Sequence, residues 1–185
     1  MNPENIYPYL VPGDIDSVGT PVGHGLFVQL FEDAESSVGI VHVPIGADRL
    51  AKEKLAVEDA HRIALANLSR FADESPALSI QVLGQPGDAV HFLLYSDHPR
   101  ASSCLLLPDL FEHACEVLQA KELLACVPQR ESLVVFPRRE RADRERLLNK
   151  LREIEADTQR PLTFELFELE AGSFKPFHET FETPA

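Results

Sequence analysis

The 185-residue sequence has few cysteines: Cys104, Cys115 and Cys126. No Cys-x-x-Cys or His-x-x-x-His spacing occurs among the cysteines and histidines. Because disulfide frameworks and metal centres show such pairings, the sequence predicts neither a disulfide scaffold nor a metal site. Each cysteine lies among apolar residues, so we expect free, buried thiols in a reducing compartment.

Long apolar runs are also missing. No segment approaches the roughly 18 apolar residues of a membrane-spanning helix. Residues 1–16 lack the basic start, apolar centre and small-residue cleavage site of a signal peptide. We therefore expect a cytoplasmic protein that does not bind a membrane.

Basic residues are scarce relative to acidic ones. Seventeen Lys and Arg against thirty Asp and Glu give a net charge of −13. Residues 1–60 alone carry ten acids and three bases, a net charge of −7, whereas residues 138–160 carry +2. Nucleic acids and anionic membranes require a cationic surface, so neither is an expected partner. An acidic surface instead favours a basic protein partner.

Motifs of enzymes are absent as well. The sequence has no Gly-x-Ser-x-Gly elbow, and the glycines of residues 19–25 lack the Lys-Ser/Thr of a phosphate-binding loop. Asp97, His98 and Ser102 are close in sequence, but a catalytic triad is defined by geometry and not by spacing. The sequence predicts no catalytic residue and no cofactor, and it favours a protein that is not an enzyme.

The periodicity of apolar residues predicts the order of secondary structure. Residues 1–23 show no period and are expected to form an irregular arm. Residues 24–31 and 37–43 then predict a hairpin whose loop is residues 32–36, and residues 52–72 predict a helix.

Two more pairs of β-rich segments follow, each ahead of a helix. The expected strands are 78–84, 89–95, 123–127, 132–136 and a last one at 162–169, with helices starting near Pro108 and over 139–157. The order ββ-α-ββ-α-ββ-α-β predicts one α+β domain over residues 24–177. Its sheet should be mainly antiparallel, built from hairpins, with helices packed on one face. In the C-terminal segment, Phe174 and Phe177 are expected to dock on this domain, and residues 178–185, which include Phe181, to form a flexible tail.

Four stretches of the sequence carry a family resemblance. They are residues 6–12, 58–71, 96–117 and 123–136, and their motif positions are Ala64, Asn67, Leu68, Asp97, Ala101, Ser102, Val127, Pro128, Arg130 and Glu131. Together they resemble the YtpQ-like family of bacterial proteins, a domain of unknown function. The resemblance implies a compact cytoplasmic bacterial domain and implies no reaction. The family pattern has Arg after Ala-Ser where this chain has Ser103, so a site that used this Arg would be altered here.

Five residues form the candidate ligand or partner site: Asn67, Asp97, Arg100, Ser102 and Arg130. Asn67 lies in the apolar stripe of the 52–72 helix, where an unpaired amide costs about 1–3 kcal/mol, so it should bond a backbone group, for which the 96–102 loop is the candidate. Arg130 lies in a tight turn, and its planar guanidinium suits a carboxylate, either Asp97 or a ligand.

Three functions remain open on this evidence. The first is a non-catalytic binding protein that meets a basic protein partner, as a regulatory module or an immunity-type inhibitor of a cationic toxin. The alternative is a small enzyme or ligand-binding protein that uses the loop 97–102 with Asn67 and Arg130. The third is a homo-oligomer formed through a sheet edge.

Overall fold

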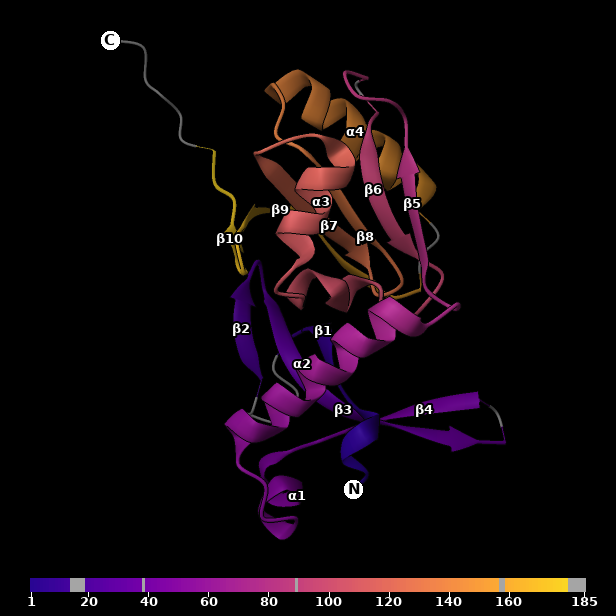
Figure 1. Cartoon of the computed structure of the whole chain (residues 1–185), viewed down its shortest axis with the longest axis vertical. Coiled ribbons are helices and arrows are strands. Elements are labelled where there is room, and N and C mark those ends of the chain that lie inside the picture. The colour runs from indigo at the N-terminus through magenta and orange to yellow at the C-terminus, as the bar shows by residue number, and fades with distance from the viewer. Residues whose placement is uncertain (14–18, 38, 89, 157–158, 180–185) are drawn as a thin grey trace.

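The computed structural model describes residues 1–13, 19–37, 39–88, 90–156 and 159–179. Two antiparallel sheets are present, with helices packed against them (Figure 1). The predicted α+β class is therefore confirmed. One feature differs from the expectation, because the strands divide between two sheets instead of forming one.

The first sheet is organised around one long strand. It contains β1 (Ile6–Pro12), β2 (Thr20–Gly23), β3 (Leu26–Ser36) and β4 (Gly39–Pro44). β3 pairs with each of the other three, always antiparallel. Its pairing with β1 ends at Glu32, which lies opposite Ile6. Beyond that point β3 pairs with β4 alone, and we call this two-stranded part, residues 33–36 and 39–42, the β3–β4 ribbon.

The prediction of an irregular arm over residues 1–23 is wrong where the structure describes that segment. A short 3-10 helix covers Pro3–Asn5, and β1 and β2 follow. Most residues of β1 are buried without alternation, because the strand has covered faces on both sides. Such a strand lacks the period of two that marks a half-exposed one. Residues 14–18 of the expected arm lie outside the described residues.

The hairpin loop expected at residues 32–36 is also wrong. These residues continue β3, and the chain reverses between Ser36 and Gly39, which face each other in the register. Acidic residues are depleted in strands, so this segment has the composition of a loop. One of its acids, Asp33, is nevertheless buried and paired, which allows the strand to continue.

The second sheet has six strands in the order β10-β9-β7-β8-β6-β5. Their bounds are β5 (Ser79–Leu83), β6 (Phe92–Ser96), β7 (Leu123–Gln129), β8 (Leu133–Pro137), β9 (Pro161–Glu170) and β10 (Ser173–Pro176). The first five match the strands expected from the sequence. β10 was not expected, and it pairs with β9 after a tight turn.

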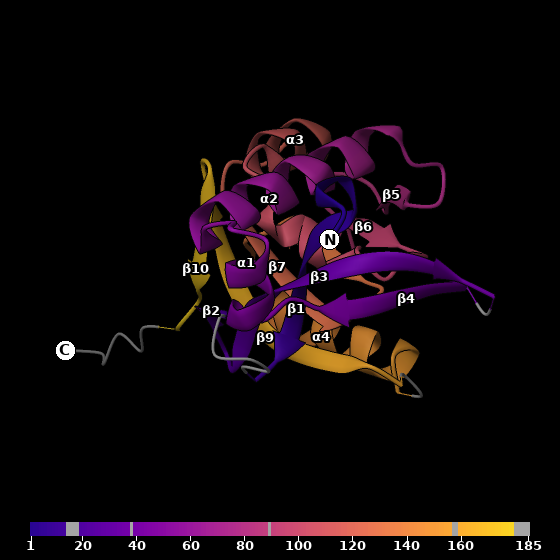
Figure 2. The ribbon, with the colours of Figure 1, turned by 90° about the horizontal axis from the view of Figure 1, so that it is seen from below.

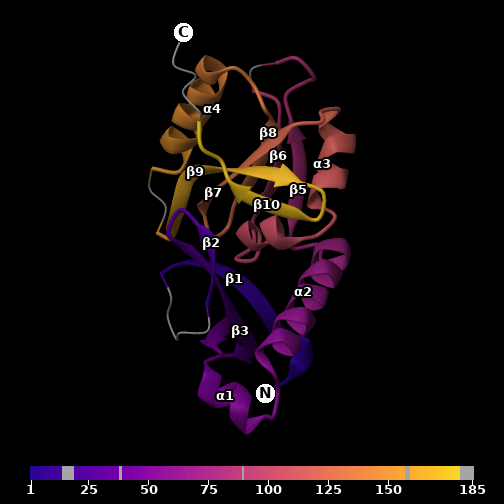
Figure 3. The same ribbon diagram turned by 90° about the vertical axis from the view of Figure 1, so that its left-hand side faces the viewer.

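Helices cover both faces of the second sheet, and not one face as expected. Besides the 3-10 helix at Pro3–Asn5, the helices of the described residues are α1 (Ala47–Lys52), α2 (Val57–Glu74), the 3-10 helix η2 (Ser102–Leu106), α3 (Leu110–Leu118) and α4 (Arg141–Ile154). Along β7, Leu123 and Ala125 belong to the core that includes α3, whereas Leu124 and Cys126 belong to the core that includes α4. Figure 3 shows α3 and α4 on opposite sides of the sheet. In the described residues, no helix has both the length and the apolar character of a membrane span.

The two sheets share one core. Leu10 and Val28 of the first sheet lie in the same buried cluster as Leu105 of η2 and Val127 of the second sheet. η2 lies between the two sheets (Figure 1). The core therefore includes β1, which precedes the residue 24 boundary that the sequence pattern suggests.

The C-terminal segment docks as the sequence predicts. The ring of Phe174 lies 5.5 Å from that of Phe167, and the backbone N–H of Phe177 donates to Leu166 at 2.8 Å. Glu179 forms ion pairs with Arg144 and Arg141 of α4. The prediction of a flexible tail from residue 178 is therefore wrong for residues 178 and 179, and the rest of that tail, including Phe181, lies outside the described residues.

Candidate functional site

A buried polar cluster lies at the base of the β3–β4 ribbon. The Asp33 carboxylate accepts a hydrogen bond from the Tyr9 hydroxyl at 2.9 Å and one from Nε of Arg100 at 3.2 Å. Nδ1 of His42 lies 2.6 Å from the same carboxylate. Asp33 and Arg100 are 7% and 6% exposed, so this pair is shielded from solvent. We call these four residues the Asp33 cluster.

Arg100 connects this cluster to the loop after β6. Its guanidinium carbon lies 3.4 Å from the ring centroid of Tyr7 and 4.5 Å from that of Phe71. Burial opposes the charge of Arg100, but Tyr9 and Asp33 outweigh burial and raise its pKa. Removing one member of a buried ion pair leaves the other uncompensated, at a cost of about 3–5 kcal/mol. The cluster therefore holds the ribbon and the loop 97–102 together.

Burial moves the pKa values of Tyr9 and of His98, which lies beside the cluster, away from neutral pH. Burial, with Asp33 next, raises the pKa of Tyr9 above its usual value. Burial and the charge of Arg100 lower the pKa of the adjacent His98 to about 4. Neither group exchanges protons near neutral pH, so neither is poised for general acid–base catalysis.

Arg130 does not pair with Asp97, contrary to the expectation. Its guanidinium carbon lies 5.0 Å from the ring centroid of Tyr9 and 5.8 Å from that of Phe31. Burial lowers the pKa of Arg130. Within the described residues Arg130 has no ion pair, and the buried carboxylate partner belongs to Arg100 instead. Arg130, in the turn, therefore stacks on aromatic rings, whereas Arg100, in the loop, forms the ion pair.

Asn67 has the structural role that its position predicts, but with a different partner. Its side-chain amide donates to the carbonyls of Pro3 and Ile6 at 2.8 and 2.9 Å. Arg70 donates to its carbonyl oxygen at 3.1 Å. The prediction that Asn67 bonds the 96–102 loop is wrong, because the N-terminal segment packs against α2 and provides the acceptor carbonyls. Asn67 is therefore fully engaged in fixing the start of β1.

Asp97 and Ser102 lie close in sequence but in different environments. Asp97 is exposed, has a φ of 69° and accepts a hydrogen bond from the Ser96 hydroxyl at 3.2 Å. Ser102 is fully buried, and its backbone N–H donates to Arg130 at 3.1 Å. The structure thus brings Arg100, Ser102 and Arg130 together at the junction of the sheets. Asp97 faces outward, and Asn67 lies on α2.

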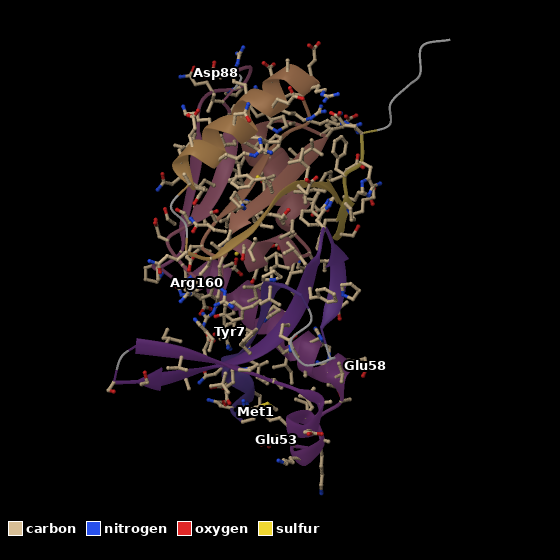
Figure 4. All side chains as sticks on the ribbon, turned by 180° about the vertical axis from the view of Figure 1, so that it is seen from behind. Met1, Tyr7, Glu53, Glu58, Asp88 and Arg160 are labelled. Carbon is tan, nitrogen blue, oxygen red and sulfur yellow. The ribbon has the colours of Figure 1, made fainter. Side chains whose placement is uncertain are left out.

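Asp97 lines a cavity of about 820 Å³. The cavity lies where β6, the β7–β8 turn, the end of α4 and the start of β9 meet. Its lining residues are Leu94, Ser96, Asp97, Gln129, Glu131, Ser132, Ile154, Glu155, Gln159 and Arg160. Figure 4 shows Arg160 on the same side of the molecule as the β3–β4 ribbon.

Carboxylates outnumber cations in this cavity. Asp97, Glu131 and Glu155 line it together with one guanidinium, that of Arg160, which pairs with Glu131 at 3.3 Å. Burial raises the pKa of Glu155, and the charge of Glu131 adds to the rise. The amide of Gln129 donates to Glu155. The cavity is therefore a region of negative potential next to a predicted site residue.

The β3–β4 ribbon exposes apolar side chains. Ile40 is 54% exposed and Val41 is 43% exposed, and Val43 at its base is 37% exposed. In the described strands β4 pairs with β3 alone, which leaves its other edge free. Figures 1 and 2 show this part of the sheet extending beyond the rest of the chain.

Sequence reasoning missed several of these residues. The sequence pattern places Asp33 in a loop and His42 in a strand. The structure pairs these two residues across β3 and β4, and an acid and a histidine close to one expected hairpin turn were a usable signal. Glu131 and Glu155 are separated by a whole helix in the chain, so no spacing rule relates them.

The cysteines provide no activated nucleophile. All three are free, as expected, and Cys104 and Cys126 are buried, whereas Cys115 is only half-buried, contrary to the expectation. Burial raises the pKa of each of these two thiols to about 12, which suppresses the reactive thiolate. Among the described residues, no group of three or more His, Cys, Asp and Glu is arranged to hold a metal ion.

Comparison with known proteins returns no relative. No family model, no curated protein and no solved structure matches the chain. The resemblance to the YtpQ-like family therefore stays a prediction from the sequence motifs.

Proposed function

We propose that this protein is a non-catalytic binding protein that takes an extended, basic segment of a protein partner along the free edge of β4. The observation that carries this proposal is the β3–β4 ribbon, whose outer strand has an unpaired edge and exposed apolar side chains. A regulatory module and an immunity-type inhibitor are both proteins of this kind.

The ribbon has the physical character of a docking strand. An isolated two-stranded ribbon is marginally stable in water, and the free edge of β4 offers backbone donors and acceptors to a third strand. Side chains alternate across the ribbon, so Ile40 and Val41 are exposed on opposite faces. An added strand would cover apolar surface on both faces while its backbone pairs with β4.

Charge selects the kind of segment. Residues 1–60, which include the ribbon, carry a net charge of −7. A field of this sign attracts basic segments and repels acidic ones before contact. We also propose that this protein is cytoplasmic, as its sequence suggests, so that its partner is a basic protein of the cytoplasm. We further propose that this protein is a member of the YtpQ-like family.

The Asp33 cluster prepares the ribbon for binding. Asp33 is the first residue of β3 beyond the reach of β1, and three side chains from β1, β4 and the loop after β6 converge on it. Polar contacts therefore replace the missing third strand at this point. A ribbon held in one orientation loses less conformational entropy on binding, which favours affinity.

The alternative of a ligand site that uses Asn67 and Arg130 has less support. Asn67 bonds the N-terminal backbone, and Arg130 stacks on Tyr9. These two side chains do not line one cavity with Asp97 in the described part of the chain.

The test uses two synthetic eight-residue peptides, (Lys-Val)4 and (Glu-Val)4, titrated against the protein by calorimetry at low and high salt. The lysine peptide should bind, and its affinity should fall as salt rises, because steering charges are screened. The Val41→Lys variant should weaken binding at least about tenfold, since a cation on an edge strand repels a basic segment.

The matched control is Val82→Lys. Val82 lies on β5, the free edge of the second sheet, and is 44% exposed, against 43% for Val41. This variant should bind the lysine peptide as the wild type does. Equal losses in both variants, or equal affinity for the two peptides, would overturn the proposal.

A further inference from the structure

We infer that the cavity beside Asp97 binds a cationic group on a short alkyl stem, an ammonium or a guanidinium. Neither the sequence motifs nor the ribbon assigns this site. The inference extends the proposed function, because a partner's lysine or arginine carries such a group, but it does not depend on the ribbon.

The first support is charge. Three carboxylates, those of Asp97, Glu131 and Glu155, line the cavity against the single guanidinium of Arg160. Arg160 pairs with Glu131 and is 54% exposed, so it lies toward the solvent side of the cavity. The negative charges that line the cavity therefore outnumber the positive ones by two. A bound cation would relieve the repulsion between these carboxylates.

The second support is a buried hydroxyl. Ser132 is only 3% exposed, lines the cavity, and its Oγ makes no hydrogen bond of normal geometry in the described residues. It lies close enough to Glu155 to lower the pKa of that carboxyl, against the larger effect of burial. A buried hydroxyl without a full set of partners is costly, so this wall of the cavity has unused hydrogen-bonding capacity next to Glu155.

The third support is an apolar wall. Ile154 lines the cavity and is 66% exposed, the most exposed large apolar side chain in the described residues. Leu94, which is half-buried, also lines the cavity. An alkyl stem can cover these side chains while its charged end reaches the carboxylates.

The chemistry of the lining favours an organic cation over a metal ion. Divalent metals need several oxygen ligands converging on one point, and the described residues contain no such group. Ammonium and guanidinium groups accept carboxylates spread over a wider pocket, because their N–H donors point in several directions. Arg160 shows that a guanidinium pairs with one of these carboxylates already.

The experiment follows backbone amide chemical shifts during titration with three probes of similar size. These are N-acetyl-lysine methylamide, N-acetyl-arginine methylamide and the uncharged N-acetyl-norleucine methylamide. The two cationic probes should shift the amides of Asp97 and Ser132, and norleucine should not. Equal shifts with all three probes, or shifts with none, would overturn the inference.

Two variants assign the effect to the cavity. Glu155→Gln should weaken the cationic probes about tenfold, the loss of one charge-assisted hydrogen bond. The matched control is Glu153→Gln, two residues before Glu155 and outside the cavity lining, and it should leave the affinity unchanged. If both variants bind alike, the cavity is not the site. A fluorescence melting curve for each variant checks that both fold.

The source of the cation is separated by a further titration with free 1,5-diaminopentane and with the (Lys-Val)4 peptide. If Glu155→Gln weakens binding of the peptide, the result identifies a partner side chain as the occupant. If Glu155→Gln weakens binding of the diamine alone, the result identifies a free amine as the occupant. Either result supports the site. Failure of the proposed function appears separately, as a Val41→Lys variant that binds the peptide normally.

Discussion

The two sheets are stabilised in different ways. In the second sheet, Leu124, Cys126 and Phe136 are fully buried under α4, and apolar packing covers both faces. In the first sheet, the segment beyond β1 depends on the Asp33–Arg100 ion pair. Apolar packing is spread over many side chains, whereas an ion pair fails when one member is lost. The segment proposed to bind a partner is thus the part of the molecule that is held by few contacts.

Removing Arg100 should have the largest effect. Arg100→Ala leaves the Asp33 carboxylate buried without its cation, so the free energy of unfolding should fall by about 3–5 kcal/mol in urea denaturation. Arg130→Ala is the control, because that guanidinium stacks on aromatic rings and has no ion pair in the described part of the chain, and it should cost about 0.5–2 kcal/mol. Equal losses in the two variants would show that the ion pair is no more important than the stacking.

A core substitution in the second sheet should separate the two regions. Leu124→Ala opens a cavity and should lower the free energy of unfolding by about 2–5 kcal/mol. Hydrogen exchange at the amides of the β3–β4 ribbon should stay as in the wild type, because the ribbon opens locally. In Arg100→Ala the same amides should exchange faster. If Leu124→Ala accelerates them equally, the ribbon and the second sheet open as one unit.

Asn67 should contribute less than Arg100. Asn67→Ala removes the donors to the carbonyls of Pro3 and Ile6, and stability should fall by about 1–3 kcal/mol in urea denaturation. Arg62→Ala on the same helix is the control, since its ion pair with Asp59 is exposed and should contribute about 0–1 kcal/mol. A loss in Arg62→Ala as large as in Asn67→Ala would contradict the structural role of the amide.

The pH dependence of His98 should be a smaller effect, because its ring is only half-buried and solvent screens part of the shift. Its folded pKa of about 4 lies below the ordinary value of 6.5, so the unfolded chain binds the extra proton first. Stability should therefore decrease as pH falls from 6.5 toward 4, and it should be unaffected by this group above 6.5. The measurement compares thermal unfolding of the wild type and His98→Gln over pH 4–7. Parallel curves for the two proteins would contradict a buried neutral imidazole.

Much of the second sheet could be predicted from its sequence. Its strands and helices have clear periods and are separated by turn residues, as at Pro108. Docking of Phe174 and Phe177 also follows from their spacing and size. β10 was missed because a four-residue strand beside a tight turn is too short to show a period.

The first sheet could not be predicted in the same way. β1 is covered on both faces, so it shows no alternation, and the proline, glycine and aspartate content of residues 1–23 suggested an arm. The extension of β3 through Ser36 depends on a partner for Asp33 that lies 67 positions further along the chain. Such a pairing is a tertiary event, and local propensity alone favours a loop there. The cavity carboxylates meet for the same reason, because the sheet order brings α4 beside the β7–β8 turn.

β3 belongs both to the buried core and to the exposed β3–β4 ribbon. Val28 and Leu30 of this uninterrupted strand are buried in the interior, and its last residues form the exposed hairpin. Because Asp33 pairs with Arg100 where the buried part ends, the exposed hairpin is joined to the loop 97–102 through one covalent strand and one ion pair.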